Sequence, residues 1–159
     1  MASSQINKMK ELDIYLKEKG FVVTIEPIPS KFFGNYICEY TNYVFRSRIL
    51  LIRDRGYVYV FLSDINSGKK WYSIINILTA IYKKKHRYFF KKQDKDSDGD
   101  YFYNLISSKD KIQTDLQVNL LKRYFTVIMS IFQENDLQVL SRIESENIDI
   151  EDIIETGHL

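Results

Sequence analysis

Cysteine, histidine and glycine are all scarce in this chain of 159 residues, and each shortage removes a class of function. The single cysteine, Cys38, excludes an internal disulfide and a zinc site built from several thiolates. The two histidines, His86 and His158, leave little material for a Ser/His/Asp or Cys/His centre. The few glycines form no phosphate-binding loop. We therefore expect no catalytic residues, no metal site and no cofactor, and we predict that the protein is not an enzyme.

Long hydrophobic runs are absent too. The most apolar windows, 49–52, 57–62 and 74–82, fall well below the roughly 20 residues that span a bilayer. The first ten residues are polar and are not followed by an apolar stretch of the kind found in signal peptides. We therefore expect a cytoplasmic protein that makes no contact with a membrane.

What the chain has in quantity is aromatic residues and unevenly placed charge. Aromatic residues make up 14% of the sequence, and the net charge is only +2. Residues 69–95 nevertheless carry nine lysines or arginines against one acid, whereas residues 134–155 carry eight acids against one arginine. A basic middle and an acidic end predict a polarised surface that steers a charged partner.

Hydrophobic periodicity predicts an N-terminal helix over 4–19. Met9, Leu12 and Leu16 recur at helical spacing, and Gly20 stands where a helix commonly ends in a left-handed residue. Four segments rich in β-branched and aromatic residues then predict an antiparallel meander; they are 21–25, 32–40, 43–53 and 57–62.

Turn residues set the limits of these strands. Pro27 and Pro29 are expected to break the pairing of the first strand, because proline has no N–H to donate. Asp54-Arg55-Gly56 predicts a tight hairpin turn.

Helical spacing returns after the strands. Trp71 is expected to open an apolar helix over 71–84, with its side chain in the core, and a long helix is expected over 109–133. Asp136 or Asn135 is expected to cap a short helix, and the isoleucines within 144–159 predict that this acidic end is docked. Residues 93–108 are expected to form an irregular excursion. The fold class is therefore α+β, a single domain over 1–159 with the helices packed on one face of the sheet.

The stretch 94–100 has the acids and glycine of the first half of an EF-hand calcium loop. The position that requires a bidentate glutamate is Leu105, so we interpret this stretch as a solvated acidic turn rather than a cation site.

Three groups of charged residues are candidates for partner binding. The first is the hairpin tip, Arg53, Asp54 and Arg55, where arginine could present its fork to a carboxylate. The second is acidic and comprises Glu144, Glu146, Asp149, Glu151 and Asp152. The third interleaves cations with aromatics, a composition typical of surfaces that bind single-stranded nucleic acid, and comprises Lys83, Lys84, Lys85, Arg87, Tyr88, Lys91 and Lys92.

One stretch of the chain resembles a known family. An apolar strand, Arg53-Asp54-Arg55-Gly56, the strand 57–62 and then Trp71 leading an apolar segment to Tyr82 are similar to a pattern in bacterial immunity-type proteins of polymorphic or contact-dependent toxin systems. The resemblance covers about residues 44–82. It implies a non-catalytic protein that binds a cognate toxin and occludes its active site.

Two interpretations of the electrostatics remain open under that resemblance. The acidic group could mimic phosphates in the basic cleft of a nuclease toxin, which we favour, or the basic run could cover an acidic cleft. Two other functions also remain open. One is a nucleic-acid-binding accessory protein using residues 82–92, which the near-neutral net charge makes the weaker hypothesis. The other is a homodimeric adaptor that buries the helix face around Leu120 and Phe125.

Overall fold

A computed structural model describes residues 2–29, 36–54, 57–85 and 116–156. The strands are β1 (Val22–Pro29), β2 (Tyr36–Asn42), β3 (Ser47–Asp54), β4 (Tyr57–Asp64), β5 (Lys70–Ser73) and β6 (Glu146–Asn147). The helices of these ranges are α1 (Ala2–Glu18), α2 (Ile74–Tyr82), α6 (Leu116–Arg123), α7 (Phe125–Gln133), α8 (Leu137–Leu140) and α9 (Ile150–Thr156).

The strands form one antiparallel sheet in the order β1-β2-β3-β4-β5-β6. The α+β class and the meander are confirmed, but the described residues contribute six strands rather than about four. The two additional strands are short: β5 pairs with β4 through Leu62 and Tyr72, and β6 pairs with β5 through Trp71 and Glu146.

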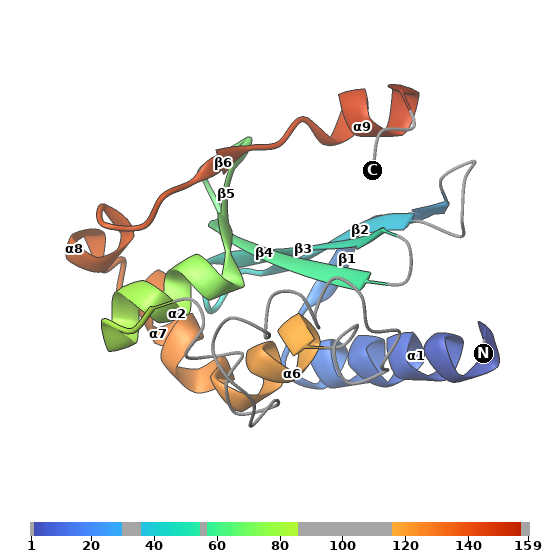
Figure 1. Ribbon diagram of the computed structural model, residues 1–159, viewed down its shortest axis with the longest axis horizontal. Helices are drawn as coiled ribbons and strands as arrows, with labels where there is room; N and C mark the ends of the chain where they lie inside the picture. The colour runs from blue at the N-terminus through green and yellow to red at the C-terminus, as the bar shows by residue number, and fades with distance from the viewer. Residues whose placement is uncertain (1, 30–35, 55–56, 86–115, 157–159) are drawn as a thin grey trace.

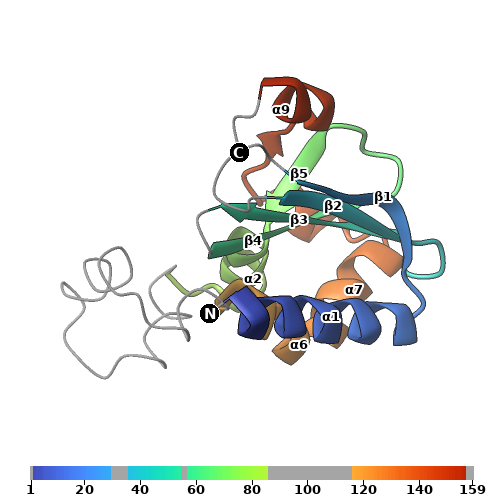
Figure 2. The same ribbon diagram turned by 90° about the vertical axis from the view of Figure 1, so that its right-hand side faces the viewer.

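Both faces of the sheet are covered, because alternate residues of its central strands enter two separate cores. Cys38, Leu51 and Val60, which pair across β2, β3 and β4, belong to the core under the helices. Their neighbours Ile37 and Leu50 belong to a second core. Helices α1, α2, α6 and α7 lie on the first face, and the C-terminal part of the chain crosses the other (Figures 1 and 2). The expectation that all helices pack on one face is therefore corrected.

The first helix ends as its sequence predicts. Gly20 has φ +94°, and the N–H groups of Gly20 and Phe21 donate to the carbonyls of Lys17 and Leu16. The side-chain amide of Asn42 donates to the carbonyl of Lys19 over 3.0 Å, which ties the end of α1 to the end of β2.

Strand β1 is longer than predicted. It continues through Pro27 to Pro29, which pairs with Tyr36, so the prediction that the prolines break the pairing is wrong. The pairing is instead irregular, with register shifts on both sides of Ile25. A proline is tolerated here because β1 stands at the end of the strand order, where an outward N–H needs no strand partner.

The third strand begins later than predicted. Residues 43–46 form a turn in which the N–H of Phe45 donates to the side chain of Asn42 and Arg46 adopts φ +55°, so β3 starts only at Ser47. The following hairpin is confirmed by the pairing of Asp54 with Tyr57. Arg55 and Gly56 lie outside the described residues.

Trp71 lies in a strand and not at the head of a helix. Helix α2 starts at Ile74, where the hydroxyl of Ser73 accepts the N–H of Ile75. The spacing of Trp71 fits either element, and its pairing in the sheet decides between them. The predicted burial of Trp71 is confirmed, since its side chain has no exposed surface.

The predicted long helix is two helices with a break at Tyr124, whose φ of −108° and ψ of 18° are not helical. The break lets the ring of Phe125 meet Tyr15, Phe21 and Phe45 edge-on. Leu120 and Phe125 are both buried in the core, which removes the face proposed for a homodimer. Asp136 caps α8 through the N–H of Val139, as predicted, while residues 109–115 lie outside the described part.

The described part of the chain has two glycines with positive φ, and they offer a stability test. In Gly68→Ala the φ of +58° strains the alanine backbone but a Cβ meets nothing within 4 Å, so we expect a loss of about 1 kcal/mol. In Gly20→Ala the φ is +94° and the Cβ lies 3.2 Å from Nδ2 of Asn42, so we expect about 2 kcal/mol or more. Urea unfolding of both variants measures the difference, and equal losses would contradict it.

Candidate binding surfaces

The acidic end of the chain, residues 144–156, is held on the far face of the sheet; we call it the C-terminal segment. Ile148 is buried in the second core, and Ile150 and Ile153 pack against that core. The other members of this core that face the segment are Ile37, Leu50, Ile52 and Trp71. The docking that the isoleucines predicted is therefore observed.

Polar contacts complete this attachment. The N–H of Ile148 donates to the carbonyl of Lys69 over 2.9 Å, extending the β5–β6 pairing. The ammonium of Lys69 lies 3.0 Å from Oδ2 of Asp149. The segment thus has a defined register on the sheet rather than a loose association.

The docking separates the predicted acidic residues into two roles. Glu144, Glu146, Glu151 and Asp152 are exposed. Asp149 instead pairs with Lys69 and accepts the N–H of Asp152 at the start of α9. These hydrogen bonds, first from Lys69 and then from the backbone, lower the pKa of Asp149. Asp149 therefore holds the segment, and the other four acids face solvent.

The C-terminal segment does not fill the space beneath it. A cavity of about 300 Å³ remains beside Trp71, and its lining includes Ile25, Ile148 and Glu151. The indole N–H of Trp71 is buried and has no acceptor within the described residues. The cavity adds a concave feature beside the acidic surface.

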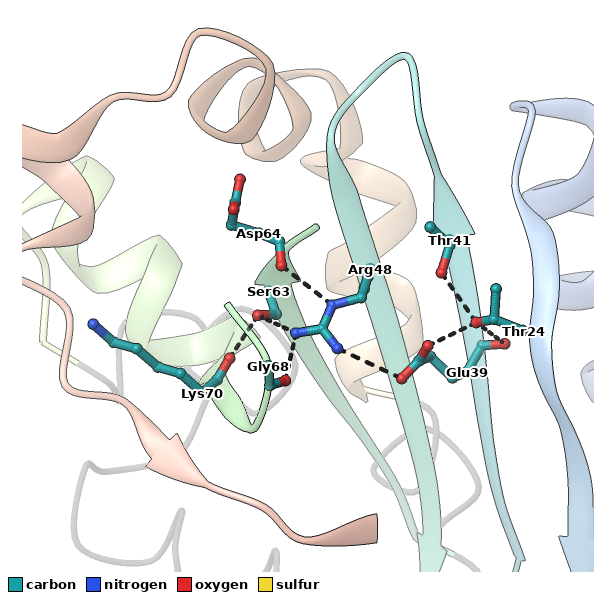
Figure 3. A network of polar contacts seen from close by, with 8 residues as sticks. All are labelled: Thr24, Glu39, Thr41, Arg48, Ser63, Asp64, Gly68 and Lys70. Atoms are coloured by element: carbon teal, nitrogen blue, oxygen red, sulfur yellow. Dashed lines mark hydrogen bonds and ion pairs between the residues drawn. The ribbon is translucent and has the colours of Figure 1, made fainter. Parts of the chain in front are cut away.

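Arg48 of β3 contacts β4 and the loop that leads into β5, the strand with which β6 of the C-terminal segment pairs (Figure 3). Its guanidinium donates to the Ser63 hydroxyl over 2.9 Å and to the carbonyls of Asp64 and Gly68 over 3.2 and 2.6 Å. It also lies 4.4 Å from the centre of the Trp71 ring. One side chain therefore connects β3, β4 and the approach to β5.

Glu39 lies on the other side of the guanidinium (Figure 3). Its Oε2 is 3.8 Å from Arg48, and its Oε1 accepts the Thr24 hydroxyl over 2.7 Å. Burial lowers the pKa of Arg48, while the charges of Glu39 and Asp64 oppose that effect. Arginine still remains protonated at neutral pH. No motif in the sequence marks this pair, although charged residues at interior strand positions are its visible signal.

Arg53 of the hairpin group does not join the acidic surface. Arg53 follows the alternation of Ile49 and Leu51 onto the helix-covered face, and its guanidinium lies 5.8 Å from the centre of the Tyr36 ring. Asp54 ends β3, and Arg55 lies outside the described residues. The sheet therefore separates Arg53 from the C-terminal segment, whereas Asp54 follows the opposite alternation, that of Leu50 and Ile52.

The basic group is described only at its first three residues. Lys83 ends α2 in a left-handed conformation with φ +54°, and Lys84 and Lys85 are exposed. The remaining members, Arg87, Tyr88, Lys91 and Lys92, lie outside the described residues, as do the excursion 93–108 and the acidic turn 94–100. Nucleic-acid binding by this group stays a prediction.

The described ranges contain no group of three or more His, Cys, Asp or Glu residues placed to hold a metal ion. Their helices are too short or too polar for any of them to cross a bilayer. Cys38 is buried, and burial, followed by the charges of Asp13 and Glu26, raises the pKa of its thiol to about 12.

Comparisons of the chain with protein-family models, with curated proteins and with solved structures found no match.

The Arg48 contacts predict a large cost for losing the cation alone. In Arg48→Met, the carboxylate of Glu39 stays buried without its cation, and we expect a loss of about 3 kcal/mol. In the double variant Arg48→Met/Glu39→Gln, that buried charge is removed, so the double variant should be more stable than the single one. Urea unfolding followed by Trp71 fluorescence measures both, and a single variant of wild-type stability would contradict the expectation.

The raised pKa of Cys38 predicts an unreactive thiol. At about pH 8, alkylation by iodoacetamide should be over about 1,000-fold slower in the folded protein than in urea. Because the folded pKa lies above the unfolded value, the resulting stability is complete below about pH 8 and is lost as pH rises toward 12. Cys38→Ala should flatten this loss in urea-unfolding curves at alkaline pH; rapid alkylation without urea would contradict the burial.

Proposed function

We propose that this protein is a non-catalytic protein-binding module, and that it serves as an immunity protein which neutralises a cognate bacterial toxin by occluding its active site. The observation that carries the proposal is the division of the C-terminal segment into a buried and an exposed side. Isoleucines attach it to the sheet while four carboxylates face solvent.

Such an arrangement suits recognition by charge. Because the segment is docked, its exposed acids are presented without the entropic cost of ordering a free chain. Acidic side chains in a fixed arrangement complement a basic cleft, such as the phosphate-binding groove of a nuclease. The toxin we propose is therefore one with a basic active site.

The cavity beside Trp71 gives this surface a second means of recognition. Charge alone steers association and fixes little of the geometry. A partner group that enters the cavity could pack against Trp71 and Ile148 while its neighbouring cations meet Glu151. This combination would distinguish one basic partner from another.

The test uses the C-terminal domain of the protein encoded directly upstream of this gene as the probe. We expect its expression to arrest bacterial growth, and co-expression of the wild-type chain to restore growth. In the triple variant Glu144→Lys/Glu146→Lys/Glu151→Lys, binding measured by calorimetry should weaken by about 100-fold at low salt, and rescue should fail. Asp149 is left unchanged because it holds the segment in place.

A matched control changes the net charge equally elsewhere. Glu11, Glu18 and Glu134 are exposed glutamates outside the C-terminal segment, and their triple substitution by lysine should preserve binding and rescue. Equal effects of the two triple variants would overturn the assignment of the surface. An upstream product that is not toxic, or that is toxic and unbound by the wild-type chain, would overturn the immunity function.

A further inference from the structure

A second cavity lies on the opposite side of the sheet from the C-terminal segment. Its volume is about 430 Å³, and it opens between α1 and the ends of β1, β2 and β3. Figure 2 shows α1 running beneath these strands. Its lining is largely apolar, and the apolar residues are Met9, Val23, Pro27, Tyr36, Cys38 and Tyr40.

The sequence explains why this space is not filled. Cys38 is a small side chain between Tyr36 and Tyr40 at the helix-facing positions of β2. Strand β1 shifts register twice between Val23 and Ile28, so it does not lay a regular row of side chains against α1. The cavity therefore follows from one small residue and one irregular edge strand.

Acidic groups lie on two walls of this cavity. On α1, Asp13 accepts the Tyr40 hydroxyl over 2.6 Å and pairs with Lys17 over 2.9 Å, which fixes its position. On β1, Glu26 forms part of the lining. Both carboxylates raise the pKa of the Cys38 thiol in addition to the larger effect of burial, so their negative potential reaches the floor.

Cations line the same cavity. Arg53 lies over the Tyr36 ring at the end of β3, and Lys10 belongs to α1. The cavity thus combines an apolar floor, two carboxylates and two cations besides the Lys17 that pairs with Asp13. Pockets of this size that combine an apolar lining with a few polar groups are typical of small-molecule sites.

We propose that this cavity binds an apolar or aromatic α-amino acid in its zwitterionic form. Its ammonium group lies toward Glu26 and Asp13, its carboxylate lies toward Arg53 and Lys10, and its side chain covers the floor at Cys38. Each charge of the ligand then meets the opposite charge, which a fatty acid or an amine alone does not achieve. The proposal uses no residue of the C-terminal segment, so it stands apart from toxin binding.

Calorimetry with four compounds tests the proposal. L-Phenylalanine carries both charges, L-phenylalaninamide lacks the carboxylate, N-acetyl-L-phenylalanine lacks the ammonium, and L-leucine tests the floor. We expect phenylalanine and leucine to bind at up to about 10 mM ligand, and each blocked analogue to bind about tenfold more weakly than phenylalanine. The amide imitates the first residue of a peptide and the acetyl compound its last, so tight binding of either would assign the site to a peptide end instead.

Single variants assign each charge. Arg53→Gln should remove the preference for phenylalanine over its amide, and Glu26→Gln should remove the preference over the acetyl compound. Arg142→Gln and Glu134→Gln are matched controls, because both residues are exposed and neither lines the cavity; they should retain both preferences. If Arg53→Gln keeps the preference for phenylalanine over its amide, as Arg142→Gln should, the proposed orientation of the ligand carboxylate toward Arg53 is overturned.

Filling the floor tests the cavity itself. Cys38→Leu should abolish phenylalanine binding while urea unfolding still shows a cooperative transition. Should that variant not fold, Val23→Phe fills the same space from β1 and gives the same expectation. Binding that persists in a folded filled variant, or wild-type protein that binds neither phenylalanine nor leucine, would overturn the proposal.

Discussion

The structure depends on the burial of both faces of its central strands. Leu50 and Leu51 are adjacent in β3, neither has exposed surface, and they enter different cores. An antiparallel sheet often leaves one face to water. Here helices α1, α2, α6 and α7 cover one face, and the C-terminal segment with its helix α9 covers the other. The attachment of that segment is therefore a consequence of strand composition.

Arg48 is a charged residue placed among these apolar strands. Its guanidinium contacts backbone carbonyls, the Ser63 hydroxyl, the Glu39 carboxylate and the Trp71 ring, so a largely buried cation has several partners (Figure 3). Trp71 in turn contributes to the core on which the isoleucines of the C-terminal segment pack. The acidic surface proposed to meet a toxin therefore depends on the second core, which lies beneath the C-terminal segment. The cavity proposed for an amino acid depends instead on the face of the sheet that α1 covers.

Much of the local structure was predictable because its signals lie within a few residues. The end of α1 at Gly20, the hairpin between Asp54 and Tyr57 and the capping by Asp136 all follow from short-range hydrogen bonds or backbone preferences. The errors arose where distant residues decide the structure. Trp71 fits a helix by its spacing, and the break at Tyr124 reflects three rings that converge on Phe125 from elsewhere in the chain.

The sequence by itself determined that this chain has an α+β fold, which residues are apolar at helical or strand spacing, and where charge of each sign accumulates. Only the tertiary structure decided which acids face solvent and which one holds the segment, and that Arg53 lies on the opposite side of the sheet. The physical reason is that burial and pairing belong to contacts between segments. Asp149 and Lys69 are far apart in the chain and 3.0 Å apart in the fold.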